Sequence, residues 1–258
     1  MAKNLLRTVL KEYKRTPGLV NTREIIDKIE SGYIADTRNG FKTKKTFSPS
    51  TIVYGHGACA RYWYLAFDGA DFQEEFTPWQ VANMRSGTLS HERIQKAIED
   101  SGIMIETETK IVHNDPPILG YRDGLIEWNG AAVPIEIKTC NDRSFEARKA
   151  SGRALSYHIE QLLIYMRIKD HDLGLIIYEN KNTHELYVVP VEMSDEYRLW
   201  LDNTFDWLRK VKQAHVNRTI PANMYRSNSK VCKSCPLLET CKTSPPGTVA
   251  IKPLEPLA

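Results

Sequence analysis

The sequence predicts an α/β fold built around one main domain. Three observations lead there. The chain has 258 residues, which allows one large domain with appendages. Residues 83–191 have the pattern of a helix, three strands, a second helix and two strands. Hydrophobic residues make up 41% of the chain and charged residues 26%, values that exclude collagen, a coiled coil, wholesale disorder and a disulfide-stapled mini-protein.

Charge and hydropathy limit the possible partners. No stretch approaches the ~18 apolar residues of a membrane span, and the first residues are too charged for a signal peptide. We therefore expect a cytoplasmic protein with no membrane contact. Lys and Arg number 35 against 32 Asp and Glu, a formal net charge of +3, so any contact with nucleic acid must use a local basic surface.

Residues 1–47 are predicted to form a basic helical extension. Pro17-Gly18 separates two helices, and Asn21 or Thr22 caps the second of them. The basic loop 38–45 fits a phosphate contact and a solvated linker equally well. Ser48-Pro-Ser then predicts a helix start that leads into an aromatic segment.

The first helix of the main domain is expected over residues 83–100. His91, Ile94 and Ile98 recur at helical spacing on one face, so the histidine should point inward with the apolar side chains. Taken alone, such a histidine is usually a satisfied core residue. Residues 103–111 then alternate between apolar and polar side chains, as in a half-buried strand.

A hairpin follows, with strands over residues 118–128 and 131–138 joined by Asn129-Gly130, a strong hairpin signal. The remaining elements complete the predicted order. They are a helix over 156–169, strands over 173–178 and 186–191, and a long helix after Ser194. Residues 244–258 are rich in proline and are expected to form an extended, mobile tail.

The hairpin carries the chemistry. A two-residue turn places Asp123 directly opposite Glu136, with Lys138 projecting from the same face. Opposed carboxylates must be exposed to water, have a raised pKa, or bind a cation. Apolar residues flank them on both faces, which favours burial, and oxygen ligands suit Mg²⁺ or Mn²⁺. The simpler alternative is a surface hairpin with an Asp–Lys pair, and a bulge near Asp123 would break the register. Pro134 suits an outer strand.

Two motifs resemble a known family. Gly120-Tyr-Arg-Asp123, followed by Glu136-Ile-Lys-Thr139, is similar to the signature of the PD-(D/E)XK nucleases. That resemblance implies a restriction-endonuclease-like core, with a central mixed sheet flanked by helices. One departure is visible, because Arg122 stands where the family's first proline is found. This proline is often replaced in the family.

Further residues resemble the RecB-like branch of that family. His91, in Gly87-Thr-Leu-Ser-His91, is similar to the branch's upstream histidine, and Gln161 with Tyr165 matches its Q-x-x-x-Y motif. By this resemblance a cation would be held by His91, Asp123, Glu136 and the backbone carbonyl of Ile137. Lys138 would assist the attack on phosphorus, while Gln161 and Tyr165 would reach the substrate or brace the site.

Four cysteines form a second candidate site. Cys232, Cys235 and Cys241 lie close enough to bind one inorganic centre, and Cys59 is the candidate fourth ligand. Their spacing is compatible with zinc and with an iron–sulfur cluster. RecB-like nucleases of the CRISPR-associated exonuclease and AddB type have one cysteine before the core and three after it, so the resemblance implies a 4Fe-4S cluster. Cys140 fits no ligand spacing and is expected to pack in the interior.

The resemblance spans about residues 48–243, which we expect to form the nuclease domain closed by the cluster. It implies a metal-dependent DNA exonuclease, acting on single strands or duplex ends in recombination, repair, CRISPR adaptation or phage DNA replication and processing. A partner from those pathways and an oligomer both remain open. Basic residues near the site could follow a DNA backbone, or form a solvated face: Arg143, Arg148, Lys149 and Arg153.

Two other classes of function remain. The first is a non-catalytic scaffold subunit that binds DNA ends and keeps the fold and the cysteine site. The second is a zinc-stabilised interaction module in which the acidic pair is incidental.

Overall fold

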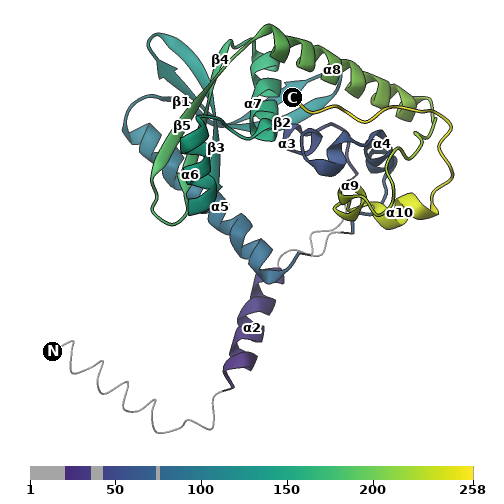
Figure 1. Cartoon of the computed structure of the whole chain (residues 1–258), viewed down its shortest axis with the longest axis horizontal. Coiled ribbons are helices and arrows are strands. Elements are labelled where there is room, and N and C mark those ends of the chain that lie inside the picture. The colour runs from purple at the N-terminus through teal and green to yellow at the C-terminus, as the bar shows by residue number, and fades with distance from the viewer. Residues whose placement is uncertain (1–20, 36–42, 74–75, 258) are drawn as a thin grey trace. The chain divides into compact units, whose positions relative to one another are not determined.

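A computed structural model describes residues 21–35, 43–73 and 76–257 (Figure 1). The chain divides into two compact units, one formed by residues up to Gly40 with Glu75–Ser86, and the other by Phe41–Glu74 with Gly87–Ala258. The expected first helix of the extension and most of the basic loop 38–45 lie outside the described residues.

The described part of the first unit consists of helix α2 (Thr22–Ile34) and the first residues of helix α5 (Pro78–Asp100), which continues into the second unit. Helix α2 is capped by Asn21, whose side chain accepts a hydrogen bond from the Glu24 backbone N–H, as predicted. Helix α5 starts at Pro78 rather than at the predicted residue 83. Thr77 and Gln80 bond each other's backbone N–H groups in a capping box, the signal that marks this earlier start.

The second unit contains a five-stranded mixed sheet in the order β1-β2-β3-β4-β5, which confirms the predicted fold class. All neighbouring strands are antiparallel except β3 and β4, which run parallel. The strands are β1 (Met104–His113), β2 (Ile118–Trp128), β3 (Ala131–Cys140), β4 (Leu173–Asn180) and β5 (Leu186–Glu192).

The β2–β3 hairpin has the predicted turn and register. Asn129 and Gly130 have φ angles of 52° and 81°, the positive values that a type I′ turn requires. The pairs run from Trp128 with Ala131 up to Gly124 with Ile135. The ladder ends there, one pair before Asp123 and Glu136.

The two neighbours of β3 pair with it over different lengths. Residues 131–135 of β3 pair with β2, and residues 135–140 pair with β4. Beyond Ile135 no further pair joins the two strands of the hairpin, so they separate there. Pro134 was predicted to mark an outer strand, and this is wrong, since β3 lies inside the sheet. Pro134 is tolerated because pairing with β4 begins only at the next residue.

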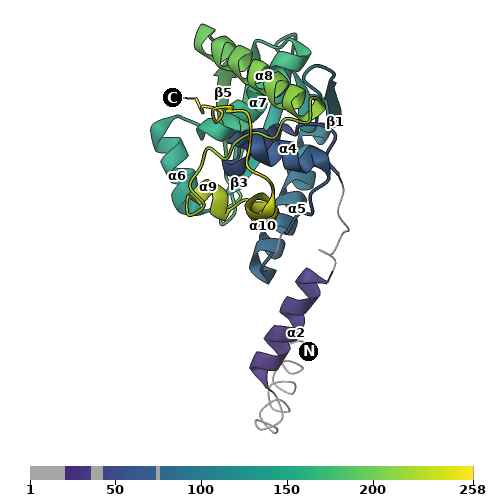
Figure 2. The same cartoon turned by 90° about the vertical axis from the view of Figure 1, so that its right-hand side faces the viewer.

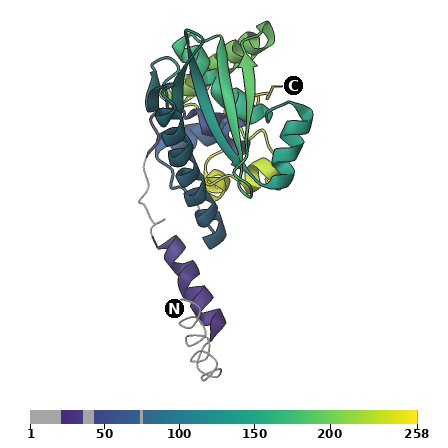
Figure 3. The same ribbon diagram turned by 90° about the vertical axis from the view of Figure 1, so that its left-hand side faces the viewer.

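Helices α5 and α7 (Ser156–Lys169) cover opposite faces of the sheet. Glu136 and Ile137 are neighbours in β3 and so point to opposite faces. Gln161 of α7 contacts Glu136, whereas Ile94 of α5 packs in one cluster with Ile137. Figure 3 shows α5 running along the sheet. A further helix, α6 (Asp142–Ser151), was not predicted, because Phe145 is its one buried residue and it shows no apolar stripe.

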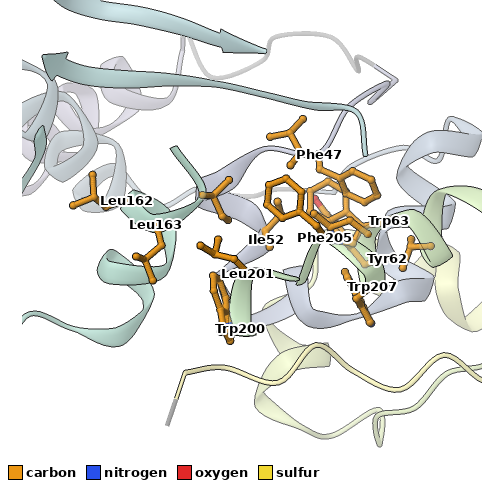
Figure 4. Close-up of a cluster of buried hydrophobic side chains, with 14 of the residues drawn as sticks. Phe47, Ile52, Tyr62, Trp63, Leu162, Leu163, Trp200, Leu201, Phe205 and Trp207 are labelled. Atoms are coloured by element: carbon orange, nitrogen blue, oxygen red, sulfur yellow. The ribbon is translucent and has the colours of Figure 1, made fainter. Parts of the chain in front are cut away.

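The main core lies between α7 and two other helices. These are α4 (Ala60–Asp68) and α8 (Asp195–Val216), the latter capped by Ser194 as predicted. Figure 4 shows Trp63, Leu162 and Leu201 among the buried side chains of this cluster. The predicted helix start at Ser48 is present, but α3 (Pro49–Ile52) is short and is followed by the 3-10 helix η1 (Gly55–Ala58).

The C-terminal region is extended and docked. After α9 (Lys230–Lys233) and α10 (Leu238–Thr243), the chain runs along α8 (Figure 2). Trp207 Nε1 donates to the Lys252 carbonyl at 2.7 Å, and Trp200 Nε1 to the Glu255 carbonyl at 3.0 Å. Ile251 is buried in the main core. The tail is therefore a packed part of the fold.

A membrane-crossing helix is not found anywhere in the described ranges, since each helix there is too short or too polar for one.

Candidate active site and cysteine site

The separation of β2 from β3 creates the candidate active site. Across it, Asp123 Oδ2 accepts a hydrogen bond from the Ile137 backbone N–H at 2.6 Å. In a strand the N–H and the carbonyl of one residue point to the same side. The Ile137 carbonyl therefore faces the same opening. Asp123 is thus held beside Glu136 by its bond to the next residue of β3, and the two acids are not a regular ladder pair.

Glu136 lies at the bottom of this site with only 1% of its surface exposed. Its Oε1 accepts hydrogen bonds from Gln161 Nε2 at 2.6 Å and from Lys138 Nζ. Its Oε2 is buried and has no hydrogen-bond partner among the described residues. Burial, and then the charge of Asp123, raise the pKa of Glu136 to about 7.

His91 reaches the site from α5. Its Nδ1 lies 3.6 Å from Asp123 Oδ1. Burial lowers the pKa of His91, but the neighbouring Asp123 carboxylate outweighs that effect, so the pKa is raised. Gln95, one turn further along α5, donates to the Asp123 backbone carbonyl at 2.9 Å. Sequence reasoning missed Gln95, although its spacing of four from His91 places both on one helix face.

Lys138 keeps its charge in this acidic environment. Burial lowers the pKa of Lys138, but the Glu136 and Asp123 carboxylates outweigh it, and the pKa is raised above the ordinary value. The side chain is 22% exposed. Lys138 therefore contacts the buried Glu136 carboxylate and also reaches solvent at the opening of the site.

Tyr165 braces β2 from α7. Its hydroxyl donates to the Tyr121 carbonyl at 2.9 Å. Burial, followed by the charges of Glu136 and Asp123, raises the pKa of Tyr165, so the hydroxyl stays protonated. A Cβ at Gly120 would stand 2.7 Å from this hydroxyl, which explains why a glycine is needed beside it.

The residues present fit a hard divalent cation. Asp123, Glu136 and the Ile137 carbonyl supply oxygen donors, and Glu136 Oε2 is a buried carboxylate oxygen without a partner. Within the described ranges, no three His, Cys, Asp or Glu side chains already enclose a metal position. The ion pairs of Lys138 with Glu136 and of His91 with Asp123 hold the site in a closed arrangement that a cation would have to open.

The basic residues predicted to follow DNA lie on α6 and just after it. Lys149 pairs with Glu185 at 2.7 Å. Arg148 is half-buried, and its Nε is buried with no hydrogen-bond partner in the part of the chain that the structure describes. Arg143 and Arg153 are exposed.

The four candidate ligand cysteines line one small cavity, together with His56 and Tyr62. All four are free, and burial raises the pKa of Cys59 and raises that of Cys235 to about 12. Such buried thiols lose their protons readily only when a metal binds. The donor set therefore fits a thiolate-bound centre, either zinc or iron–sulfur. Cys140 lies apart from them, half-buried against the main core.

Sequence reasoning missed two polar residues at this cavity. His56 lines it, and its Nδ1 is buried with no partner among the described residues. Arg61 donates from Nε to Cys241 Sγ at 3.2 Å. Arg61 could have been noticed, because it lies two residues after Cys59 near the start of α4.

No protein-family model matches the chain, and no curated protein sequence is similar to it. Solved structures are similar in fold. The mixed sheet flanked by helices is a PD-(D/E)XK-like fold, similar to that of an alkaline exonuclease.

The alkaline exonuclease LHK-Exo from Laribacter hongkongensis aligns with a TM-score of 0.52 and 13% identity, over 74% of this chain and 95% of its own. LHK-Exo in complex with dAMP aligns with a TM-score of 0.52 and 17% identity, over 67% and 91%. The structure named SSO0001 covers 84% of this chain and 96% of its own, with 18% identity and a TM-score of 0.47.

Proposed function

We propose that this protein is a metal-dependent DNA exonuclease that hydrolyses phosphodiester bonds at single-stranded or duplex ends. One observation carries the proposal: a pair of carboxylates at the opening between β2 and β3, Asp123 half-buried and Glu136 buried, in which Glu136 Oε2 has no partner among the described residues. The shared fold supports it, because LHK-Exo is an exonuclease and has been solved with dAMP.

His91, Asp123, Glu136 and the Ile137 carbonyl would hold Mg²⁺ or Mn²⁺. When bound, such a cation lowers the pKa of a coordinated water and polarises a phosphoryl oxygen. Glu136 is buried away from bulk solvent, where electrostatic interactions are stronger.

Each neighbouring residue has a role that follows from its contacts. Gln161 holds Oε1 of Glu136, which leaves Oε2 available. Lys138 is protonated and its side chain is 22% exposed to solvent, so it can offset the negative charge that develops at phosphorus or orient the attacking water. Tyr165 fixes β2 next to Asp123 through the Tyr121 carbonyl. Gln161 and Tyr165 thus act by bracing the site.

The DNA backbone would approach along α6. Arg148 suits a phosphate contact, because its half-buried guanidinium has an Nε with no partner in the described structure. Arg143 and Arg153 lie on either side of it in the sequence and are exposed. Recombination, repair, CRISPR adaptation and phage DNA processing all use an activity of this kind.

The cysteine site would hold a 4Fe-4S cluster as a structural staple, with zinc as the alternative occupant. Cys59 precedes the sheet in the chain, and the other three cysteines follow it. A centre bound by all four therefore ties the two flanks of the nuclease domain together. Iron and zinc analysis of anaerobically purified protein, with its visible spectrum, distinguishes the two occupants.

The test is a digestion assay on the anaerobically purified full chain with Mn²⁺. Substrates are labelled single strands and duplexes, unblocked or blocked at the 5′ or the 3′ end. We expect wild type to degrade the unblocked substrates. A block at only one of the two ends should protect the DNA, and the end at which it does so gives the polarity of digestion. Glu136→Gln should lose at least ~100-fold in rate, whereas Glu192→Gln, an exposed control in β5, should match wild type. An inactive wild type, or an equally active Glu136→Gln, would overturn the proposal.

A further inference from the structure

Arg61 is a buried cation at the edge of the cysteine cavity. It lies in the first turn of α4 and is only 3% exposed. Each guanidinium nitrogen has an acceptor. Nε donates to Cys241 Sγ at 3.2 Å, Nη1 to the Pro221 carbonyl at 3.0 Å, and Nη2 to the Pro245 carbonyl at 2.8 Å. Nη2 also has longer contacts with the carbonyls of Cys241 and Ser244.

None of these acceptors is a carboxylate. Across the described residues, the ion pairs of the structure do not include Arg61, and its partners are neutral carbonyls and one sulfur. A buried charge that has hydrogen bonds but no counter-charge remains costly. A neutral donor would satisfy the same carbonyls without that cost. An arginine at this position is therefore expected to have a negatively charged partner.

The cysteine site can supply that partner. Four thiolates carry more negative charge than a Zn²⁺ ion or a four-iron core neutralises, so either centre has a net negative charge. The Nε–Sγ contact places the guanidinium directly against one ligand sulfur. Hydrogen bonds to ligand sulfurs and nearby charge are known to tune such centres.

We propose that Arg61 is the built-in counter-ion of the cysteine-bound centre and donates a hydrogen bond to one of its sulfurs. This inference rests on the proposed metal centre at the four cysteines. Through its other nitrogens, the same guanidinium joins that centre to the start of the C-terminal tail at Ser244 and Pro245. Arg61 is therefore a positioning residue for the centre, with no role at the nuclease site.

The test compares three variants of the full chain, each purified anaerobically with its centre loaded. Arg61→Lys keeps the charge, whereas Arg61→Gln keeps an amide donor and removes the charge. Trp207→Phe is the matched control, because it removes a bond that anchors the tail at Lys252 but involves no sulfur. The readouts are the rate at which a chelator removes the metal, and thermal stability with and without the centre. For an iron–sulfur centre, the reduction potential is measured as well.

We expect Arg61→Gln to lose the metal ~10–100-fold faster than wild type, Arg61→Lys to be intermediate, and Trp207→Phe to match wild type. The reduction potential of Arg61→Gln should shift to more negative values, because the extra electron is less stabilised. Arg61→Gln should destabilise the loaded protein more than the metal-free protein.

Equal destabilisation of both forms, with chelator resistance like that of wild type, would overturn the inference and leave Arg61 as a tail anchor. A wild-type protein that binds neither iron nor zinc at the cysteines would overturn the cysteine centre itself, and Arg61 with it. That second result is seen before any Arg61 variant is made, so the two failures are distinguishable.

Discussion

Asp123 Oδ2 accepts a hydrogen bond from the Ile137 backbone N–H at 2.6 Å, across the point where β2 and β3 separate. A side chain here takes the place of the missing strand partner. Because the β2–β3 ladder stops at Ile135, the edge of β3 that faces β2 would otherwise be left open at Ile137. The same bond holds the Asp123 carboxylate next to Glu136, the neighbour of Ile137, and so fixes the acidic pair.

Lys138→Met should abolish most of the DNA-degrading activity while leaving the fold intact. Lys138 is charged and directed at the carboxylates, and loss of one group that stabilises transition-state charge typically costs ~10²–10³ in rate. Single-turnover digestion of end-labelled DNA measures the effect. Lys210→Met, an exposed change on α8, is the control and should leave the rate unchanged. An active Lys138→Met protein would remove this residue from the mechanism.

The stability of the metal-free protein should fall as pH rises from about 4.5 towards about 7. The pKa of Glu136 is raised to about 7 from 4.5, so over this range the unfolded chain loses its proton while the folded chain keeps it. Glu136→Gln should remove this fall and be more stable than wild type at pH 8. Thermal melts in chelator, at a series of pH values, test both statements. If the thermal stability of wild type and of Glu136→Gln changed with pH in the same way, Glu136 would not be a buried carboxylate with a raised pKa.

Gly120→Ala should destabilise the protein by ~1–3 kcal/mol. The new methyl group would stand 2.7 Å from Tyr165 Oη and 2.8 Å from Pro49 Cδ, so α7 or α3 would have to shift. Gly87→Ala is the matched control, because its added methyl group meets nothing within 4 Å in helix α5. That change should stabilise by ~0.5–1 kcal/mol. Chemical denaturation compares them, and similar effects of both substitutions would show that the Gly120 contact is not tight.

Ile251→Ala should cost ~2–4 kcal/mol, although the residue lies in a proline-rich tail without regular structure. Its side chain is 9% exposed and belongs to the main core. Ile105→Ala in β1, where the side chain is 48% exposed, is the control and should cost less than ~1 kcal/mol. Urea unfolding curves give both values. If the tail were loosely attached, the two substitutions would have the same small effect.

The local parts of the fold could be predicted from the sequence because their causes are local. Asn129-Gly130 favours positive φ angles, which fix the hairpin turn and hence the register up to Gly124. Helix α7 was predicted with its observed bounds, and its Q-x-x-x-Y spacing places Gln161 and Tyr165 on one face. These features place Asp123 and Glu136 at the same end of the hairpin, although the expected direct pairing of the two residues is absent.

Other features depend on distant residues and could not be predicted. The β2–β3 ladder stops at Gly124 and Ile135, whereas β3 goes on pairing with β4, which begins only at Leu173. Arg61 contacts Cys241, 180 residues further along the chain. Helix α6 lacks an apolar stripe, although its capping residues, Asn141 and Gly152, were visible in the sequence.

The most direct measurement of the central claim is the binding of Mn²⁺ by the metal-stripped nuclease site, followed by electron paramagnetic resonance at pH 8. Wild type should bind the ion, and Asp123→Asn combined with Glu136→Gln should lose that binding, while Glu192→Gln, exposed in β5, should retain it. Binding by the double variant with wild-type affinity, or no binding by wild type, would contradict the account that the opening between β2 and β3 holds a divalent cation.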